Sequence, residues 1–163
     1  MAYKSVEEIL DDLKAVLQEN FEATLAAICS SKSASVTVPV PSEHGYFIAN
    51  NIDTVPDLSL LPAVVLMGWN ETIELAGEQL WDQWLFDIAV RVYASGREPE
   101  TLSRSIYRYA DAIVKMVRNN FSSLSDVLDV QDIRVDYSTV APTEPLLQAV
   151  EITFKVRAVR DYS

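Results

Sequence analysis

Few side chains in this sequence are suited to covalent or acid–base chemistry, and none stands in a recognisable catalytic motif. His44 is the only histidine, and it lies beside Gly45 in an irregular segment. No serine or cysteine occupies a nucleophile motif such as G-x-S-x-G, so no nucleophile–histidine–acid triad is expected. Cys29 is the only cysteine and ends an apolar stripe, which favours a buried small side chain over a reactive thiolate. The sequence therefore predicts no catalytic residues and a protein that is not an enzyme.

Cofactor and metal sites are not expected either. The four glycines are scattered, and neither phosphate-binding pattern, G-x-x-x-x-G-K or G-x-G-x-x-G, occurs. Asp126, Asp129 and Asp132 are evenly spaced, but they lack the glycine and the terminal glutamate of a calcium loop, which favours a solvated acidic turn. The acidic residues near the N-terminus are expected to form an exposed helix face: Glu7, Glu8, Asp11 and Asp12. We predict no cofactor and no metal.

The charge balance excludes two further classes of partner. The chain has 163 residues, with 24 acidic against 13 basic side chains and a formal net charge of −11. Such a chain lacks the clustered lysines and arginines that neutralise nucleic-acid phosphates, so tight DNA binding is not expected. The longest apolar run, residues 60–69, contains Pro62 and is shorter than the roughly 20 residues that span a bilayer. No signal peptide and no membrane association are expected.

Aromatic residues in or beside predicted loops are the strongest candidates for a functional surface. Aromatic side chains are enriched at the centres of protein interfaces, although they also cap the ends of a core, and the sequence leaves both interpretations open. The candidate interface residues are Tyr46, Phe47, Trp69, Trp81 and Trp84. Residues 70–83, between Trp69 and Trp84, are predicted to form a polar, acidic connection between two strands. This connection contains Glu71, Glu74, Glu78 and Asp82.

These residues must be positioned by a strand and helix at 84–120. Residues 85–93 alternate, with Phe86, Ile88, Val90 and Val92 on one apolar face, as in a half-buried strand. After Ser95-Gly96, Pro99 suits the first turn of a helix, and apolar residues then recur at three- and four-residue steps to a stop at 119–120. A strand that leads into such a helix predicts a sheet with helices packed on its apolar face.

The remaining elements complete one predicted domain over residues 1–163. A capping box at Ser5 and Glu8 starts a helix that runs to about Cys29. A long irregular loop follows at about 30–57, with a short edge strand possible at 36–40, and then a strand at 60–69 that is apolar on both faces. After a turn at 122–129, strands at 132–137, with Ile133, Val135 and Tyr137 inward, and at 147–159 form an antiparallel pair. The predicted class is α+β: a single mixed or antiparallel β-sheet with two main α-helices packed on one face.

The order of these elements resembles the tail terminator (tail completion) proteins of long-tailed bacteriophages. The resemblance covers the N-terminal helix, the variable loop, strands at 61–66 and 84–93, the long helix, and the closing strands at 132–137 and 148–159. It implies a homo-oligomeric, hexameric ring that sits on the tail tube, ends its polymerisation and joins it to the neck or connector proteins. The implied location is the virion, after synthesis in the host cytoplasm, with no catalytic residues to transfer.

The resemblance also gives the acidic charge a role. DNA would pass through the ring without being tightly bound, and an acidic channel would repel its phosphates. Glu71, Glu74, Glu78 and Asp82 are the candidate channel-facing residues, and Trp84→Ala is expected to weaken assembly more than folding. Two alternatives stay open: another neck or tail component of related fold, such as a head–tail joining or tube protein, and a small-molecule enzyme.

Overall fold

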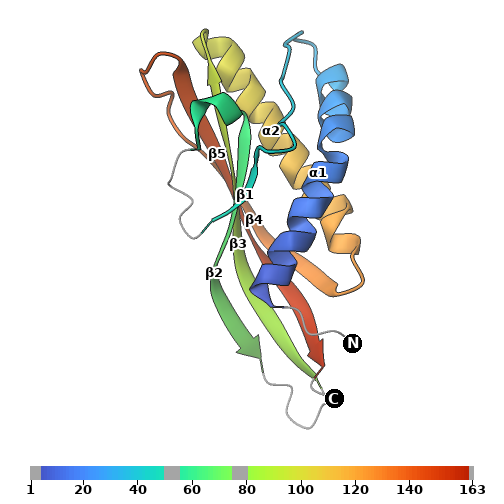
Figure 1. The fold of residues 1–163 in the computed structure, drawn as a ribbon. Helices are drawn as coiled ribbons and strands as arrows, with labels where there is room; N and C mark the ends of the chain where they lie inside the picture. Colours follow the sequence, from blue (N-terminus) through green and yellow to red (C-terminus); the bar gives the residue numbers. More distant parts are fainter. Residues whose placement is uncertain (1–4, 50–55, 75–80, 162–163) are drawn as a thin grey trace.

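The structure is a computed structural model that describes residues 5–49, 56–74 and 81–161 (Figure 1). Its elements are α1 (Val6–Ser31), β1 (Tyr46–Ile48), η1 (Leu58–Leu60), β2 (Ala63–Glu74), β3 (Trp81–Gly96), α2 (Pro99–Asn119), η2 (Phe121–Ser123), β4 (Val127–Tyr137) and β5 (Leu146–Asp161), where η marks a short 3₁₀ helix. One sheet has the strand order β1-β2-β3-β5-β4. β1 pairs with β2 in parallel, and the other neighbours are antiparallel. The predicted α+β class, with one mixed sheet and two main helices, is confirmed.

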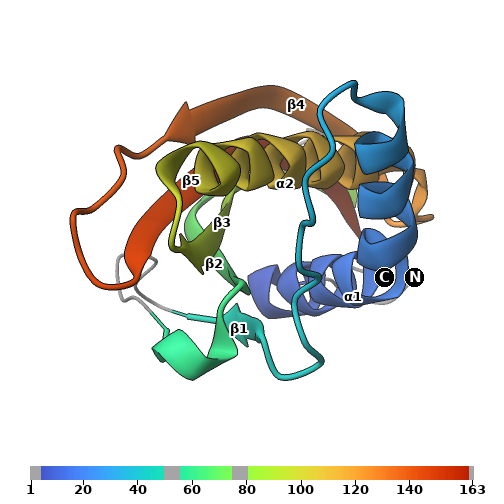
Figure 2. The ribbon, with the colours of Figure 1, turned by 90° about the horizontal axis from the view of Figure 1, so that it is seen from above.

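The core lies between the sheet and the two helices, which both pack on the same face (Figure 2). The alternation in β3 has its expected consequence, because its apolar residues at every second position are fully buried under the helices: Phe86, Ile88, Val90 and Val92. The neighbouring strand β5 adds a parallel row of buried side chains: Val150, Ile152, Phe154 and Val156. Each large side chain buried in this way contributes about 1.5–3 kcal/mol to stability.

The start of α1 is held by a cap and by a glycine beneath it. The predicted capping box is present: the Glu8 amide donates to the Ser5 hydroxyl at 3.4 Å, and the Ser5 amide donates to the Glu8 carboxylate at 2.7 Å. Below the first turn, Gly68 of β2 leaves room for Val6, since a Cβ on Gly68 would lie 2.5 Å from Val6 Cγ2. The missing side chain allows α1 to lie close on β2.

Gly68→Ala is therefore expected to destabilise the protein by about 1–3 kcal/mol, the usual cost of overfilling a packed contact. Gly96→Ala is a matched control, because a Cβ there would approach Leu102 no closer than 3.4 Å, an ordinary contact. Urea denaturation followed by circular dichroism measures both variants. Equal midpoints for the two would contradict the role given to Gly68.

Two predicted features of the loop at 30–57 were wrong. Residues 36–40 form no strand, because Pro39 lacks an amide and the segment's carbonyls bond to α2 instead: Arg108 donates to Val36 O and Tyr109 to Pro39 O. The edge strand is β1, inside the part of the loop predicted to be irregular, where Val64 N donates to Gly45 O at 2.7 Å. Tyr46, Phe47 and Ile48 therefore lie against β2.

The strands are also longer than predicted around 70–83, which was expected to be a polar connection. β2 continues to Glu74 and β3 begins at Trp81, with a bulge in the pairing between Gly68 and Asn70. The paired ends of these strands, with the end of β5, project beyond the helices (Figure 1). β4 likewise begins at Val127, inside the predicted turn at 122–129. Each strand continues past the end of its alternating apolar pattern because its residues there still pair with a neighbouring strand.

Candidate functional site

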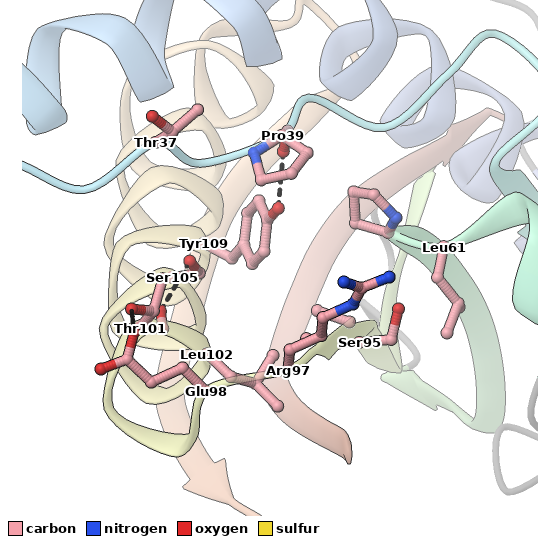
Figure 3. A pocket seen from close by; sticks show the side chains of 13 residues that line it. Thr37, Pro39, Leu61, Ser95, Arg97, Glu98, Thr101, Leu102, Ser105 and Tyr109 are labelled. Carbon is pink, nitrogen blue, oxygen red and sulfur yellow. Dashed lines mark hydrogen bonds between the residues drawn. The ribbon is translucent and has the colours of Figure 1, made fainter. Parts of the chain in front are cut away.

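The pocket at the start of α2 has a volume of about 440 Å³ and is bounded by α2, the end of β3 and residues 37–39 (Figure 3). Its hydroxyl groups are used within the protein. The Tyr109 hydroxyl donates to Pro39 O at 2.5 Å, and the Ser105 hydroxyl donates to Thr101 O at 2.9 Å. Arg97 extends across the opening towards Ser95 (Figure 3). The described lining residues include no histidine or cysteine, so the pocket offers no nucleophile–base pair.

The reactive side chains of the sequence lie apart on different elements. His44 is exposed in the turn before β1, and Cys29 is half-buried near the end of α1. Within residues 5–49, 56–74 and 81–161, no group of three or more histidine, cysteine or acidic side chains is arranged to hold a metal ion. None of the helices in these ranges is long and apolar enough to cross a membrane.

Two of the five predicted interface aromatics lie in the core. The Trp84 side chain is 5% exposed and stacks on Phe86 with ring centroids 6.1 Å apart. Tyr46 is 7% exposed and meets Phe21 edge-on, with ring centroids 6.4 Å apart. Burial raises the pKa of Tyr46 to about 12, so its hydroxyl stays protonated near neutral pH. The interface interpretation of Trp84 is corrected, because a side chain inside the core offers little surface to a partner.

The other predicted aromatics differ in exposure. Trp69 is 51% exposed on the projecting part of β2. Phe47 lies on the opposite face of the sheet from the helices and packs against the cluster formed by Val65, Ala89 and Tyr93. The Trp81 backbone belongs to β3, and its side chain lies outside the described part of the structure. Trp69 is therefore the candidate with the largest described surface.

Of the predicted acidic residues, only Glu71 has a described side chain. Glu71 is exposed on β2, beyond the bulge. The backbones of Glu74 and Asp82 belong to β2 and β3, while their side chains and the whole of Glu78 lie outside the described residues. The structure therefore gives a surface position to Glu71 alone among the four candidate channel residues.

The helix-free face of the sheet carries a second cluster that sequence reasoning did not predict. Val65, Ala89 and Tyr93 are buried there. Beside them, Arg91 donates to the Glu151 carboxylate through Nε at 3.0 Å and through a terminal nitrogen, and to the Tyr93 hydroxyl at 3.1 Å. The partner of Arg91 on β5 is set by strand pairing and not by local sequence.

A tyrosine pair on the far edge of the sheet was also missed as a surface feature. Tyr107 of α2 and Tyr137 of β4 pack edge-on, with ring centroids 5.1 Å apart, and each remains about half exposed. Ile133, Val135 and Tyr137 lie on the helix side of β4, as predicted, but Tyr137 lies at the margin of the core and remains 48% exposed. Burial, with nearby Asp111, raises the pKa of Tyr137. Tyr107 does not belong to the apolar stripe of α2, so the sequence could have predicted that its side chain is exposed.

Comparison of the chain with protein-family models and with curated proteins gives no match.

Proposed function

We propose that this chain is the structural subunit of a bacteriophage ring that closes the tail tube, joins it to the neck of the virion and performs no chemistry of its own. The observation that carries the proposal is a pair of different exposed apolar patches on one subunit. The hairpin patch consists of Trp69 and Ile73 on β2, which are 51% and 46% exposed. The tyrosine patch consists of Tyr107 and Tyr137.

The two patches lie far apart in the sheet. β3 and β5 separate β2 from β4 in the strand order. Along the strands, Ile73 is level with Trp84 and Ala158, whereas Tyr137 is level with Val150 and Val92, near the other end of the ladder. A closed ring needs a heterologous interface, in which one patch of each subunit meets a different patch of the next. Two separated patches supply that requirement.

The charge of the chain supports a passage for DNA. A net charge of −11 gives the subunit a surface that repels phosphates, and Glu71 lies exposed on the projecting hairpin next to the hairpin patch. A conduit should not retain the polymer that moves through it. We propose a hexameric ring whose hairpins contribute acidic groups towards the channel.

Mixing two patch variants tests the proposal directly. Trp69→Glu disables the hairpin patch and Tyr137→Glu disables the tyrosine patch, while each variant keeps the other patch intact. Under the proposal, each variant alone is a monomer by sedimentation velocity. An equal mixture forms a heterodimer, because one native interface can form and the ring cannot close. Leu58→Glu, at a similarly exposed apolar residue on η1, is the control and retains the wild-type ring.

Two results would overturn the proposal. A mixture that stays monomeric means that the two patches do not meet each other. Variants that keep the wild-type oligomer mean that neither patch is an interface.

A further inference from the structure

A groove between α1 and the segment before β1 has features of a peptide-binding site. It has a volume of about 530 Å³. One wall is α1, which contributes Glu19 and Glu22, and the other wall contains Val40, Pro41 and Glu43. All three carboxylates are exposed, and the described lining residues include no lysine, arginine or histidine. We call this surface the acidic groove.

The floor of the acidic groove holds a polar group that the protein does not use. Tyr46 lines the groove, and only 7% of this residue is exposed. Its ring packs against Phe21, but its hydroxyl makes no hydrogen bond with any residue in the described part of the chain. Tyr109 differs in this respect, because its hydroxyl donates a hydrogen bond to Pro39 O. The ring of Tyr46 is buried but its hydroxyl oxygen is open to the groove, so an acceptor that enters the groove can receive a hydrogen bond from it.

The chemistry of the walls defines the occupant. Three carboxylates without a neutralising base favour a ligand with cationic groups. Val40, which is 40% exposed, and Pro41 favour apolar contact along the other wall. An unused hydroxyl donor favours a backbone carbonyl, which a polypeptide has and a simple polyamine lacks.

We propose that the acidic groove binds an extended, arginine- or lysine-bearing segment of a partner protein. Basic side chains of the segment pair with Glu19, Glu22 and Glu43, and one of its backbone carbonyls accepts from the Tyr46 hydroxyl. The inference goes beyond the proposed ring function and does not depend on it, because a single subunit carries the whole groove.

A different protein fits the groove better than a second copy of this chain. The net charge of −11 opposes the approach of a second copy to three carboxylates, and five of the 13 basic side chains are already paired within the chain: Lys32 with Asp111, Arg91 with Glu151, Arg104 with Glu100, Arg134 with Asp136, and Lys155 with Asp132. Arg108 is buried. Inserting one of these groups into a neighbour's groove would first break an existing contact.

Fluorescence anisotropy with a labelled hexapeptide of alternating arginine and valine tests the proposal. A peptide with citrulline in place of arginine is the neutral control. The groove variant is Glu19→Gln, Glu22→Gln and Glu43→Gln, and the matched control variant is Glu7→Gln, Asp11→Asn and Glu144→Gln. Each variant removes three exposed carboxylates and so reduces the net charge of −11 by the same amount. Titrations in about 150 mM NaCl suppress long-range attraction, which would affect both variants equally.

We expect the groove variant to bind the arginine peptide at least about tenfold more weakly, and the control variant to stay within about twofold of the wild type. Tyr46→Phe keeps the charge and the ring, and we expect a loss of about two- to tenfold from the missing hydrogen bond. Equal losses in both triple variants, or no binding by the wild type, would overturn the proposal. A groove variant that loses the protein's own oligomer would assign the groove to a second copy and overturn it as well.

Discussion

Trp84→Ala is expected to lower the free energy of unfolding by about 3–5 kcal/mol, among the largest effects of any single truncation in this protein. The Trp84 side chain is 5% exposed, belongs to the helix-side core and stacks on Phe86. Its removal leaves a cavity that the surrounding strands cannot fill without breaking their ladder. Urea denaturation monitored by circular dichroism measures the loss.

Trp69→Ala is the matched control for this prediction. It removes the same side chain from the adjacent strand, but Trp69 is half exposed. We expect its free energy of unfolding to change by less than about 1 kcal/mol. Under the proposed function, this variant instead weakens self-association. A stable Trp84→Ala protein with a lost oligomer would restore the interface interpretation and contradict the packing described above.

Arg108→Met is expected to destabilise the protein by about 1.5–3 kcal/mol and to loosen residues 34–39. Arg108 is 4% exposed, and its guanidinium donates to Ala34 O at 2.5 Å and to Val36 O at 3.3 Å. Methionine replaces the aliphatic part of the side chain but leaves both carbonyls without these donors. Hydrogen exchange of the 34–39 amides, together with urea denaturation, measures the two effects.

Arg104→Met controls for loss of charge on the same helix. Arg104 lies one turn earlier and bonds to the Glu100 carboxylate at 2.8 and 3.0 Å, but both side chains are largely exposed. Exposed pairs of this spacing contribute about 0.3–0.5 kcal/mol. Equal effects at positions 104 and 108 would mean that Arg108 does not hold the loop.

The sequence predicted elements whose causes are local. The capping box, Pro99 in the first turn of α2 and the alternation of residues 85–93 each depend on residues a few positions apart. The predicted start of α1 and both predicted ends of α2 therefore agree with the structure. The alternation could also have predicted the burial of Trp84. Alternate residues of a strand lie on the same face, and Trp84 is two residues before the buried Phe86.

Features that depend on residues far apart in the sequence could not be predicted from local patterns. Whether residues 36–40 pair as a strand depended on Arg108 and Tyr109, which lie in α2 and take up the carbonyls of the segment. The Arg91–Glu151 pair depends on the register of β3 with β5. The acidic groove combines residues 15–22 of α1 with residues 40–46, so no single stretch of sequence carries its pattern.

Electron microscopy of the purified protein, alone and mixed with tail-tube subunits, tests the ring proposal most directly. The expected result is a closed ring of uniform size, with six-fold symmetry, that caps tube ends and stops their growth. A monomer at every concentration that leaves tube assembly unchanged would contradict the proposal, and open filaments of the chain alone would indicate a tube protein instead.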